Sequence, residues 1–320
     1  MSGMENLPRV ALDWHRAGRG AALATVVETW GSAPRRTGSQ LVISGDGAIE
    51  GSVSGGCVEG AVIVEAIEAL DDGKPRLLSF GVSDGDAFAV GLACGGTIRV
   101  LVEPVGTALP EAVLAELVAA REARQAVAYV TDLESGGPHL SRAHVHRLRM
   151  DRSGVEEDGR TFVAVHNPPL RLLVVGAVHI AQGLVGMAQS CGYDPVIIDP
   201  RETFASPERF PGCEVMHDWP DDAVTGLGLD PRTALVLLTH DPKLDDPAIE
   251  AALRSGVFYI GALGSTRTHA KRLERLTERG FSPQDLERIH GPIGLDIGAA
   301  NPAEIAVSIM AEMTQVLRKG

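Results

Sequence analysis

The sequence predicts an α/β protein, with an N-terminal α+β domain followed by a C-terminal Rossmann-like domain that has a doubly wound parallel sheet. Beyond residue 168, short and continuously apolar runs alternate with helical stretches, which is typical of a parallel sheet covered on both faces. The first half mixes strand and helix patterns without this alternation. Between the two halves, "NPPL" at residues 167–170 interrupts any sheet ladder, because proline cannot donate a ladder hydrogen bond. We therefore expect domains at residues 1–167 and 168–320.

Composition narrows the class of protein further. The 320 residues carry a formal net charge of −13, which argues against nucleic acid and against an anionic membrane surface as partners. No apolar run approaches the roughly 20 residues that span a bilayer, and the first residues lack the pattern of a signal peptide. We expect a cytoplasmic chain with reduced thiols. The four cysteines form no CxxC pair, so a zinc site of ordinary spacing is not expected.

The N-terminal half should contain several strands and at least two helices. "GDG" at residues 45–47 lies between two β-prone runs and indicates a hairpin. Residues 58–70 are apolar almost all round, which predicts a helix buried on most of its surface. Pro110 should open a second helix, because proline is well tolerated in the first turn. The β-prone segments of this half are residues 21–30, 41–53, 97–105, 126–133, 139–150 and 161–167.

Four short apolar runs, each closed by Gly, Asp or Pro, predict the parallel strands of the C-terminal half. The last helix has a clear start, with Asn301 as the N-cap, Pro302 in the first position and Glu304 in the third, as in a capping box. The four runs are residues 171–176, 195–200, 233–241 and 257–265.

The first candidate site is "GSVSGGCVEG", in which Cys57 follows Gly55 and Gly56 directly. If these glycines form a turn before the buried helix, Cys57 lies near the helix N-terminus. Free amide groups and the helix dipole there stabilise a thiolate, and glycines allow a ligand to approach the main chain. A reactive thiol beside an anion-binding loop is therefore one interpretation. The alternative is a small buried hydrophobic residue in a tight turn, which is a common role of free cysteine.

A mirrored arrangement, Cys94 followed by Gly95 and Gly96, lies at the start of a predicted strand. The two thiols could face one cavity. Arg35 is a further candidate from this half, because a guanidinium offers a planar fork suited to phosphate. A solvated turn explains Arg35 equally well.

The second candidate site follows the first strand of the C-terminal half. Gly176 opens a turn there, His179 follows at the start of a helix, and Asp199 ends the next strand. This layout is typical of dinucleotide binding, in which the acid binds a ribose hydroxyl. However, Val178 replaces the second glycine of the motif, and its side chain should crowd a pyrophosphate. NAD(P) binding is therefore weakened, and a Rossmann scaffold that no longer binds NAD is an equal alternative.

Two more segments place polar or glycine residues after strands of the C-terminal half. His240 and Asp241 follow one apolar run, and Gly264 and Ser265 follow another. Ligands of open parallel sheets bind outside the carboxyl ends of the strands, so these residues should line one crevice. Each histidine taken singly fits a structural or solvated role as well.

Together these motifs resemble the XdhC/CoxI family. "GSAPRRTGSQLVISGDGAIEGSVSGGCVEG" and "GLACGG" resemble its N-terminal domain. "LLVVGAVHIA", "TALVLLTHD", "YIGALGS" and "GPIGLDIGAANPAEIAVSIMAE" resemble its C-terminal Rossmann domain. The glycine turn of the family usually reads G-A-G-H-V-A, so Val178 departs from the family pattern as well.

The resemblance implies an accessory chaperone for molybdenum hydroxylases such as xanthine dehydrogenase. Relatives hold the molybdenum cofactor, as molybdopterin or its cytosine dinucleotide form, while a cysteine desulfurase supplies the terminal sulfido ligand. They then help to pass the cofactor to the apoenzyme. Carried over to this chain, Cys57 is the expected contact for the molybdenum, since soft thiolates suit such a metal. The Rossmann crevice suits the phosphate or nucleotide end.

Several alternatives and open points remain at this stage. An NAD(P)-dependent oxidoreductase could use the Rossmann half with a thiol or His240 as acid or base. A purely structural protein could dock on the hydroxylase and bind nothing small. We expect a chaperone rather than an enzyme with its own turnover. The apolar last helix and the resemblance are both compatible with a homodimer, while the client hydroxylase is not defined by the sequence.

Overall fold

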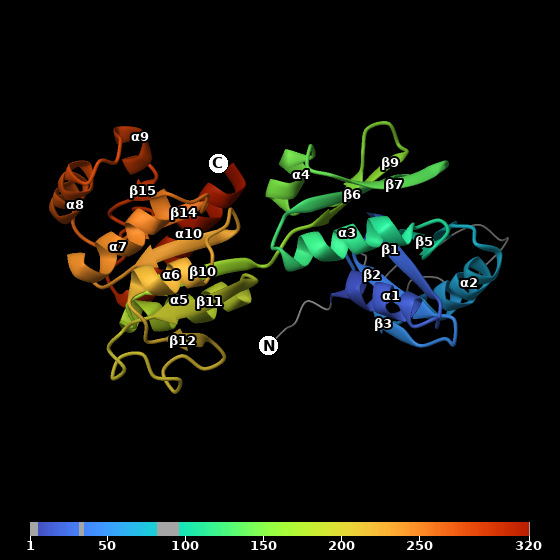
Figure 1. The fold of residues 1–320 in the computed structure, drawn as a ribbon, viewed down its shortest axis with the longest axis horizontal. Helices are drawn as coiled ribbons and strands as arrows, with labels where there is room; N and C mark the ends of the chain where they lie inside the picture. The colour runs from blue at the N-terminus through green and yellow to red at the C-terminus, as the bar shows by residue number, and fades with distance from the viewer. Residues whose placement is uncertain (1–5, 32–34, 82–95, 320) are drawn as a thin grey trace. The chain divides into compact units, whose positions relative to one another are not determined.

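The computed structural model describes residues 6–31, 35–81 and 96–319 of the chain. By their internal contacts the residues separate into two compact units, Met1–Pro168 and Pro169–Gly320 (Figure 1). Antiparallel sheets form the first unit and a six-stranded, all-parallel sheet forms the second, which confirms the predicted α/β class with a Rossmann-like C-terminal domain.

The first unit combines helices with two antiparallel sheets. Its elements in chain order are α1 (Leu7–Arg16), β1 (Ala21–Trp30), β2 (Gln40–Ser44), β3 (Ile49–Gly51), α2 (Glu59–Asp72), β4 (Arg76–Phe80), β5 (Thr97–Pro104), α3 (Glu111–Glu122), β6 (Val127–Asp132), β7 (Gly136–Ser141), α4 (Val145–Met150), β8 (Gly154–Val155) and β9 (Thr161–His166).

The larger sheet of this unit has the order β3-β2-β1-β5-β4 and is covered on both faces. The alternation of side chains along a strand directs Ala22 and Ala24 of β1 toward α2, and Leu23 toward α1 and α3. A cluster of buried residues lies on each face. The start of α2, where Cys57 lies, is therefore fixed against the central strands of the sheet.

The smaller sheet has the order β7-β6-β9-β8. Here the predicted strand over residues 139–150 is wrong in its second half, because β7 ends at Ser141 and helix α4 follows. Within α4, Leu148 packs against a small cluster formed by Ala128, Val130 and Val163 of the sheet. The packing of Leu148 thus helps to hold as a helix a segment whose composition suits a strand.

The second unit contains the elements of a doubly wound fold. In chain order they are β10 (Leu170–Val175), α5 (His179–Ser190), β11 (Tyr193–Ile198), β12 (Glu214–Met216), α6 (Pro220–Gly226), β13 (Thr233–Leu237), α7 (Pro242–Leu253), β14 (Tyr259–Ala262), α8 (Thr266–Glu278), α9 (Pro283–Leu286), β15 (Ile289–His290) and α10 (Pro302–Lys319).

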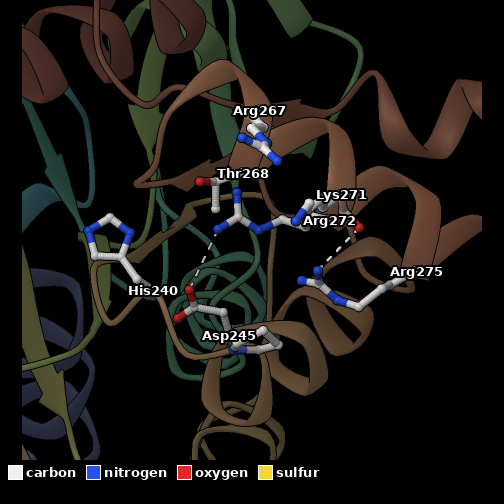
Figure 2. Close-up of a pocket in the computed structure, with 8 residues that line it drawn as sticks. His240, Asp245, Arg267, Thr268, Lys271, Arg272 and Arg275 are labelled. Carbon is white, nitrogen blue, oxygen red and sulfur yellow. Dashed lines mark hydrogen bonds and ion pairs between the residues drawn. The ribbon is translucent and has the colours of Figure 1, made fainter.

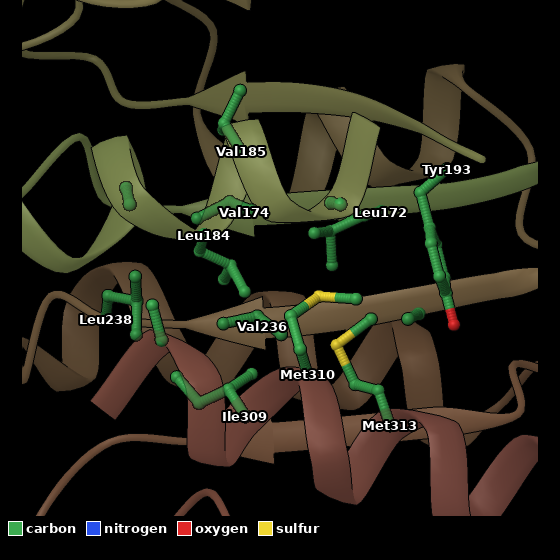
Figure 3. Close-up of a cluster of buried hydrophobic side chains, with 14 of the residues drawn as sticks. Leu172, Val174, Leu184, Val185, Tyr193, Val236, Leu238, Ile309, Met310 and Met313 are labelled. Carbon is green, nitrogen blue, oxygen red and sulfur yellow. The ribbon is translucent and has the colours of Figure 1, made fainter. Parts of the chain in front are cut away.

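The parallel sheet of the second unit has the order β12-β11-β10-β13-β14-β15. Numbered within the unit, this order is 3-2-1-4-5-6, which is that of dinucleotide-binding folds. Successive strands are added on one side of β10 as far as β12, and on its other side from β13 onward. Leu172 and Val174 pack against α5 and α10 (Figure 3), whereas Leu173 and Val175 pack on the opposite face with α6, α7 and α8. Burial on both faces explains the continuously apolar strands.

The start of the last helix agrees with the sequence in its main feature. The amide of Glu304 donates to Asn301 Oδ1 over 3.0 Å, so Asn301 is the cap. The Glu304 carboxylate accepts from the amide of Ala300 rather than from that of Asn301. No helix within the described ranges combines the length and apolar character needed to cross a membrane.

Candidate functional site

The loop that carries Cys57 connects β3 to α2. Gly55 and Gly56 have φ angles of 73° and 109°, in the left-handed region that favours glycine, and both residues are exposed. Cys57 follows them, is partly buried, and packs against the cluster that fixes α2 to the sheet. The sequence therefore predicted the position of this thiol at the helix start correctly.

The Glu59 carboxylate is the acceptor for most donors of this loop. Oε1 accepts from the Ser52 hydroxyl at 2.8 Å and from the amides of Val53 and Ser54 at 3.3 and 2.9 Å. Oε2 accepts from the amide of Gly56 at 2.9 Å and from the Ser54 hydroxyl. The amides of Val53, Ser54 and Gly56 are therefore used by Glu59 and are not free for an external anion, which disfavours the interpretation of this loop as an anion-binding site and leaves the alternative of a tight turn.

These hydrogen bonds also set the ionisation of Glu59. Burial alone raises the pKa of this carboxyl, but the hydrogen bonds from Ser54 and Ser52 outweigh it and lower the pKa from 4.5 to about 2. An internal carboxylate thus holds the loop in one conformation, directly before the helix that follows Cys57. The loop presents its thiol on a fixed backbone rather than beside an open anion site.

Of the other predicted residues of the first unit, the structure describes Arg35 and Gly96. Arg35 is exposed, whereas Gly96 is buried next to Gly31, since a Cβ built on Gly31 lies 3.5 Å from the Gly96 Cα. Cys94 and Gly95 lie outside the described residues. The expectation that Cys94 and Cys57 face one cavity therefore stays a prediction.

The thiols of the second unit differ from Cys57 in setting. Cys191 is exposed at the end of α5. Cys213 is partly buried and donates to the carbonyl of Pro195 at 3.1 Å, and burial raises its pKa to about 11, which disfavours a thiolate. Across residues 6–31, 35–81 and 96–319, no group of three or more His, Cys, Asp or Glu could hold a metal ion.

The glycine turn of the second unit lies where β10 meets α5. Gly176 has a φ of 107°, and a Cβ built there lies 2.8 Å from Thr239 Cγ2 and 3.2 Å from the Thr239 amide nitrogen. Only glycine allows the segment after β13 to approach this closely. Val178 is the N-cap residue of α5 and packs partly against the core, and His179 is exposed as the first residue of the helix.

Asp199 is completely buried at the end of β11, and four hydrogen bonds use its carboxylate. Oδ1 accepts from the backbone amide and Nε of Arg201, at 3.0 and 2.8 Å. Oδ2 accepts from Arg201 Nη2 at 2.8 Å and from the amide of Ala177 at 2.9 Å. Burial alone raises the pKa of Asp199, but these contacts outweigh it and lower the pKa. In this conformation the lone pairs that a ribose hydroxyl needs are already used.

The remaining predicted residues follow β13 and β14. Asp241 caps α7 by accepting from the amide of Lys243 at 2.9 Å, and Ser265 caps α8 by accepting from the amide of Thr268 at 3.2 Å. His240 is exposed with a φ of 61°, which is uncommon for a residue with a side chain. Gly264 has a φ of 143° directly before the Ser265 cap.

A cavity of about 330 Å³ lies beside His240, between the starts of α7 and α8 (Figure 2). Of the residues predicted from the sequence, only His240 lines it. The other lining residues, most of them cationic, were missed: Pro242, Asp245, Arg267, Thr268, Lys271, Arg272 and Arg275. A signal was present, because "STRTHAKRLER" gathers four Arg or Lys residues on one short helix and places Arg267 in its first turn, where a cation is disfavoured.

Arg272 and Asp245 are the buried pair of this cavity, with 2% and 1% of their surfaces exposed. Arg272 Nη2 donates to the carbonyl of Leu263 at 3.1 Å and lies 3.6 Å from Asp245 Oδ2. Asp245 Oδ1 accepts from the Thr239 hydroxyl at 2.6 Å. Thr239 also lies close to Gly176. The same residue therefore positions Asp245 of the cavity and packs against the glycine turn.

The fold and these sites define a Rossmann-domain protein whose antiparallel first unit carries a thiol on a glycine loop. Matches to family models identify the family of this protein. Residues 172–313 match the model described as the XdhC Rossmann domain, and residues 14–81 match that of the XdhC and CoxI family. The chain therefore belongs to the XdhC/CoxI family.

Similarity to individual proteins extends over almost the whole chain. The chain is 33% identical over 309 residues to the molybdenum cofactor insertion chaperone PaoD of Escherichia coli strain K12, and the aligned region covers 96% of this chain and 87% of PaoD. It is 27% identical to a protein of Bacillus subtilis strain 168 that is named as a probable xanthine dehydrogenase component, covering 93% and 94%. A crystal structure from Bacillus halodurans, described as a xanthine dehydrogenase, matches with a TM-score of 0.61 and 26% identity, covering 98% and 96%.

Proposed function

We propose that this chain binds the molybdenum cofactor as cargo and delivers it to a molybdenum hydroxylase such as xanthine dehydrogenase. In this proposal a cysteine desulfurase supplies the terminal sulfido ligand while the chain holds the cofactor. The observation that carries it is the similarity to PaoD, a molybdenum cofactor insertion chaperone, along 96% of the chain. The four cysteines of the sequence lack iron–sulfur spacing, in keeping with an accessory role rather than that of a complete hydroxylase.

The Cys57 loop has the chemistry that such a cargo needs. A thiolate is a soft ligand, and the cofactor brings its own dithiolene sulfurs to the metal, so a single protein thiol adds one matching ligand. Gly55 and Gly56 leave the backbone before Cys57 exposed and without side chains. Because Glu59 fixes the loop, the thiol is presented in one position, which lowers the entropic cost of binding.

The crevice of the second unit suits the phosphorylated end of the cofactor better than it suits NAD(P). Val178 stands where a dinucleotide motif has its second glycine, and the Asp199 carboxylate is buried and used by Arg201 and Ala177. Both features argue against the oxidoreductase alternative. The proposal therefore assigns to the second unit a binding role without hydride transfer.

A transfer assay tests this function. The full-length chain is loaded with sulfurated molybdenum cofactor and mixed with a molybdenum hydroxylase apoenzyme, and hydroxylase activity is followed with time. We expect faster and more complete activation than with the same amount of free cofactor mixed with an unrelated protein. Equal activation by the two mixtures would remove the delivery role.

A further inference from the structure

Helix α8 has an unusual distribution of charge. Its first turn contains Arg267 and no acidic residue, and three further cations, Lys271, Arg272 and Arg275, lie along the helix, Arg275 in its last turn. The helix dipole makes the N-terminal end electropositive, so a cation in the first turn destabilises the helix unless an anion neutralises it. The chain as a whole carries a net charge of −13, so the cluster also runs against the overall composition.

Internal carboxylates neutralise only half of this cluster. Arg275 forms a bidentate ion pair with Asp246, in which Nε and Nη2 donate to the two carboxylate oxygens at 2.6 and 2.9 Å. Arg272 lies 3.6 Å from Asp245. For Arg267 and Lys271, no carboxylate of the described residues comes within ion-pair distance, and both side chains are exposed beside the cavity. Arg267 and Lys271 therefore contribute two positive charges to the cavity that no described carboxylate neutralises.

The buried donors of Arg272 are an independent indication of a ligand site. Only 2% of it is exposed, and Nε and Nη1 donate to no acceptor among the residues that the structure describes. Buried donors without a partner are rare, because each loses its hydration without replacement. In Figure 2, Asp245 and Arg267 lie on opposite sides of the Arg272 guanidinium. Asp245 thus pairs with this group from one side, and Arg272 lines the cavity together with the exposed Arg267 and Lys271.

We propose that this cavity binds a phosphoryl group, supplied either by a nucleotide or by the phosphate of a pterin cofactor. The forked guanidinium of Arg272 and the charges of Arg267 and Lys271 match the oxygens of a phosphate, and the Thr268 hydroxyl, which lies 3.0 Å from the Ser265 hydroxyl, also lines the cavity. About 330 Å³ accommodates a phosphate or a diphosphate. The site follows β14 and is separate from the glycine turn, where Val178 occupies the usual position for a phosphate-binding glycine.

This inference deepens the proposed function, on which the pterin source of the phosphoryl group rests, whereas binding of a simple phosphorylated ligand requires neither molybdenum nor a hydroxylase. It is tested by titrating the full-length chain, purified without cofactor, with inorganic pyrophosphate in a calorimeter. Lys271→Gln and Arg267→Gln remove the exposed cations without disturbing the core. Lys74→Gln is the matched control, because it removes an exposed lysine from the first unit.

We expect the wild type and Lys74→Gln to bind pyrophosphate equally, and each cavity variant to bind about tenfold more weakly, as for the loss of one charge-assisted contact. No binding by the wild type, or equal weakening by Lys74→Gln, would overturn the assignment. Competition then identifies the source of the phosphoryl group. Displacement of pyrophosphate by CTP indicates a nucleotide. Displacement by molybdopterin but not by CTP indicates the pterin phosphate. Displacement by neither would contradict the proposed ligand class.

Discussion

Replacing Glu59 by alanine should release the loop that carries Cys57 and destabilise the first unit by about 2–4 kcal/mol. The substitution leaves the amides of Val53 and Ser54 and the Ser54 hydroxyl without their acceptor, and each buried donor that is left unpaired costs about 1–3 kcal/mol. The loop should also lose its protection against amide exchange. Hydrogen exchange of peptides covering residues 52–62, together with urea unfolding, measures both effects.

The same change should alter the pH dependence of stability. The pKa of Glu59 is about 2 in the folded chain and 4.5 ordinarily, so its charged form stabilises the fold fully above pH 4.5. This contribution is lost as the pH falls toward 2. The difference between wild type and Glu59→Ala should therefore be large at pH 7 and small near pH 2. Glu68→Ala, at an exposed position of the same helix, serves as the control. Unchanged exchange and stability in Glu59→Ala would refute the role of this carboxylate.

Gly176→Ala should destabilise the second unit by about 3 kcal/mol. Part of this cost is backbone strain at a φ of 107°, and part is the collision of the new Cβ with Thr239, 2.8 Å away. Because Thr239 also supports Asp245, pyrophosphate binding at the cavity should weaken in parallel. Thermal unfolding and calorimetry measure the two effects.

Gly186→Ala gives a matched comparison for this prediction. Gly186 lies within α5, its φ is not in the left-handed region, and a Cβ there meets nothing within 4 Å. Alanine at such a position should raise helix stability by about 0.5–1 kcal/mol. If the two variants melt at the same temperature, the close approach between the turn and Thr239 is not structurally required.

The Rossmann half was largely predictable because its signals are local and repeated. Its strands are buried on both faces, so they appear as uninterrupted apolar runs, and each ends at a residue that breaks the strand. The cap at Asn301 was equally clear, since capping depends on residue type at fixed positions. The sequence also placed Cys57 at the start of a helix, where the structure has it.

Most of the features that were missed depend on tertiary contacts. Helix α1 is the exception, because its buried residues Leu7, Ala11 and Leu12 already follow helical spacing in the sequence. The helical part of residues 139–150 was taken as strand, because the partners of Leu148 come from the sheet. The role of Glu59 was missed for the same reason. Its five hydrogen bonds follow from the path of the folded loop, and the spacing of Glu59 and its donors does not reveal them. The unsatisfied Arg272 is visible only after folding buries it.

The molybdenum and pterin content of the chain after incubation with the molybdenum cofactor tests the central proposal most directly. Wild type, Cys57→Ser and Cys191→Ser are compared after gel filtration; serine is close in size to cysteine, and Cys191 is an exposed thiol of the second unit. We predict that the wild type and Cys191→Ser keep the cofactor and that Cys57→Ser loses most of it. Equal retention by all three proteins would contradict the assignment of Cys57 as the contact for the molybdenum.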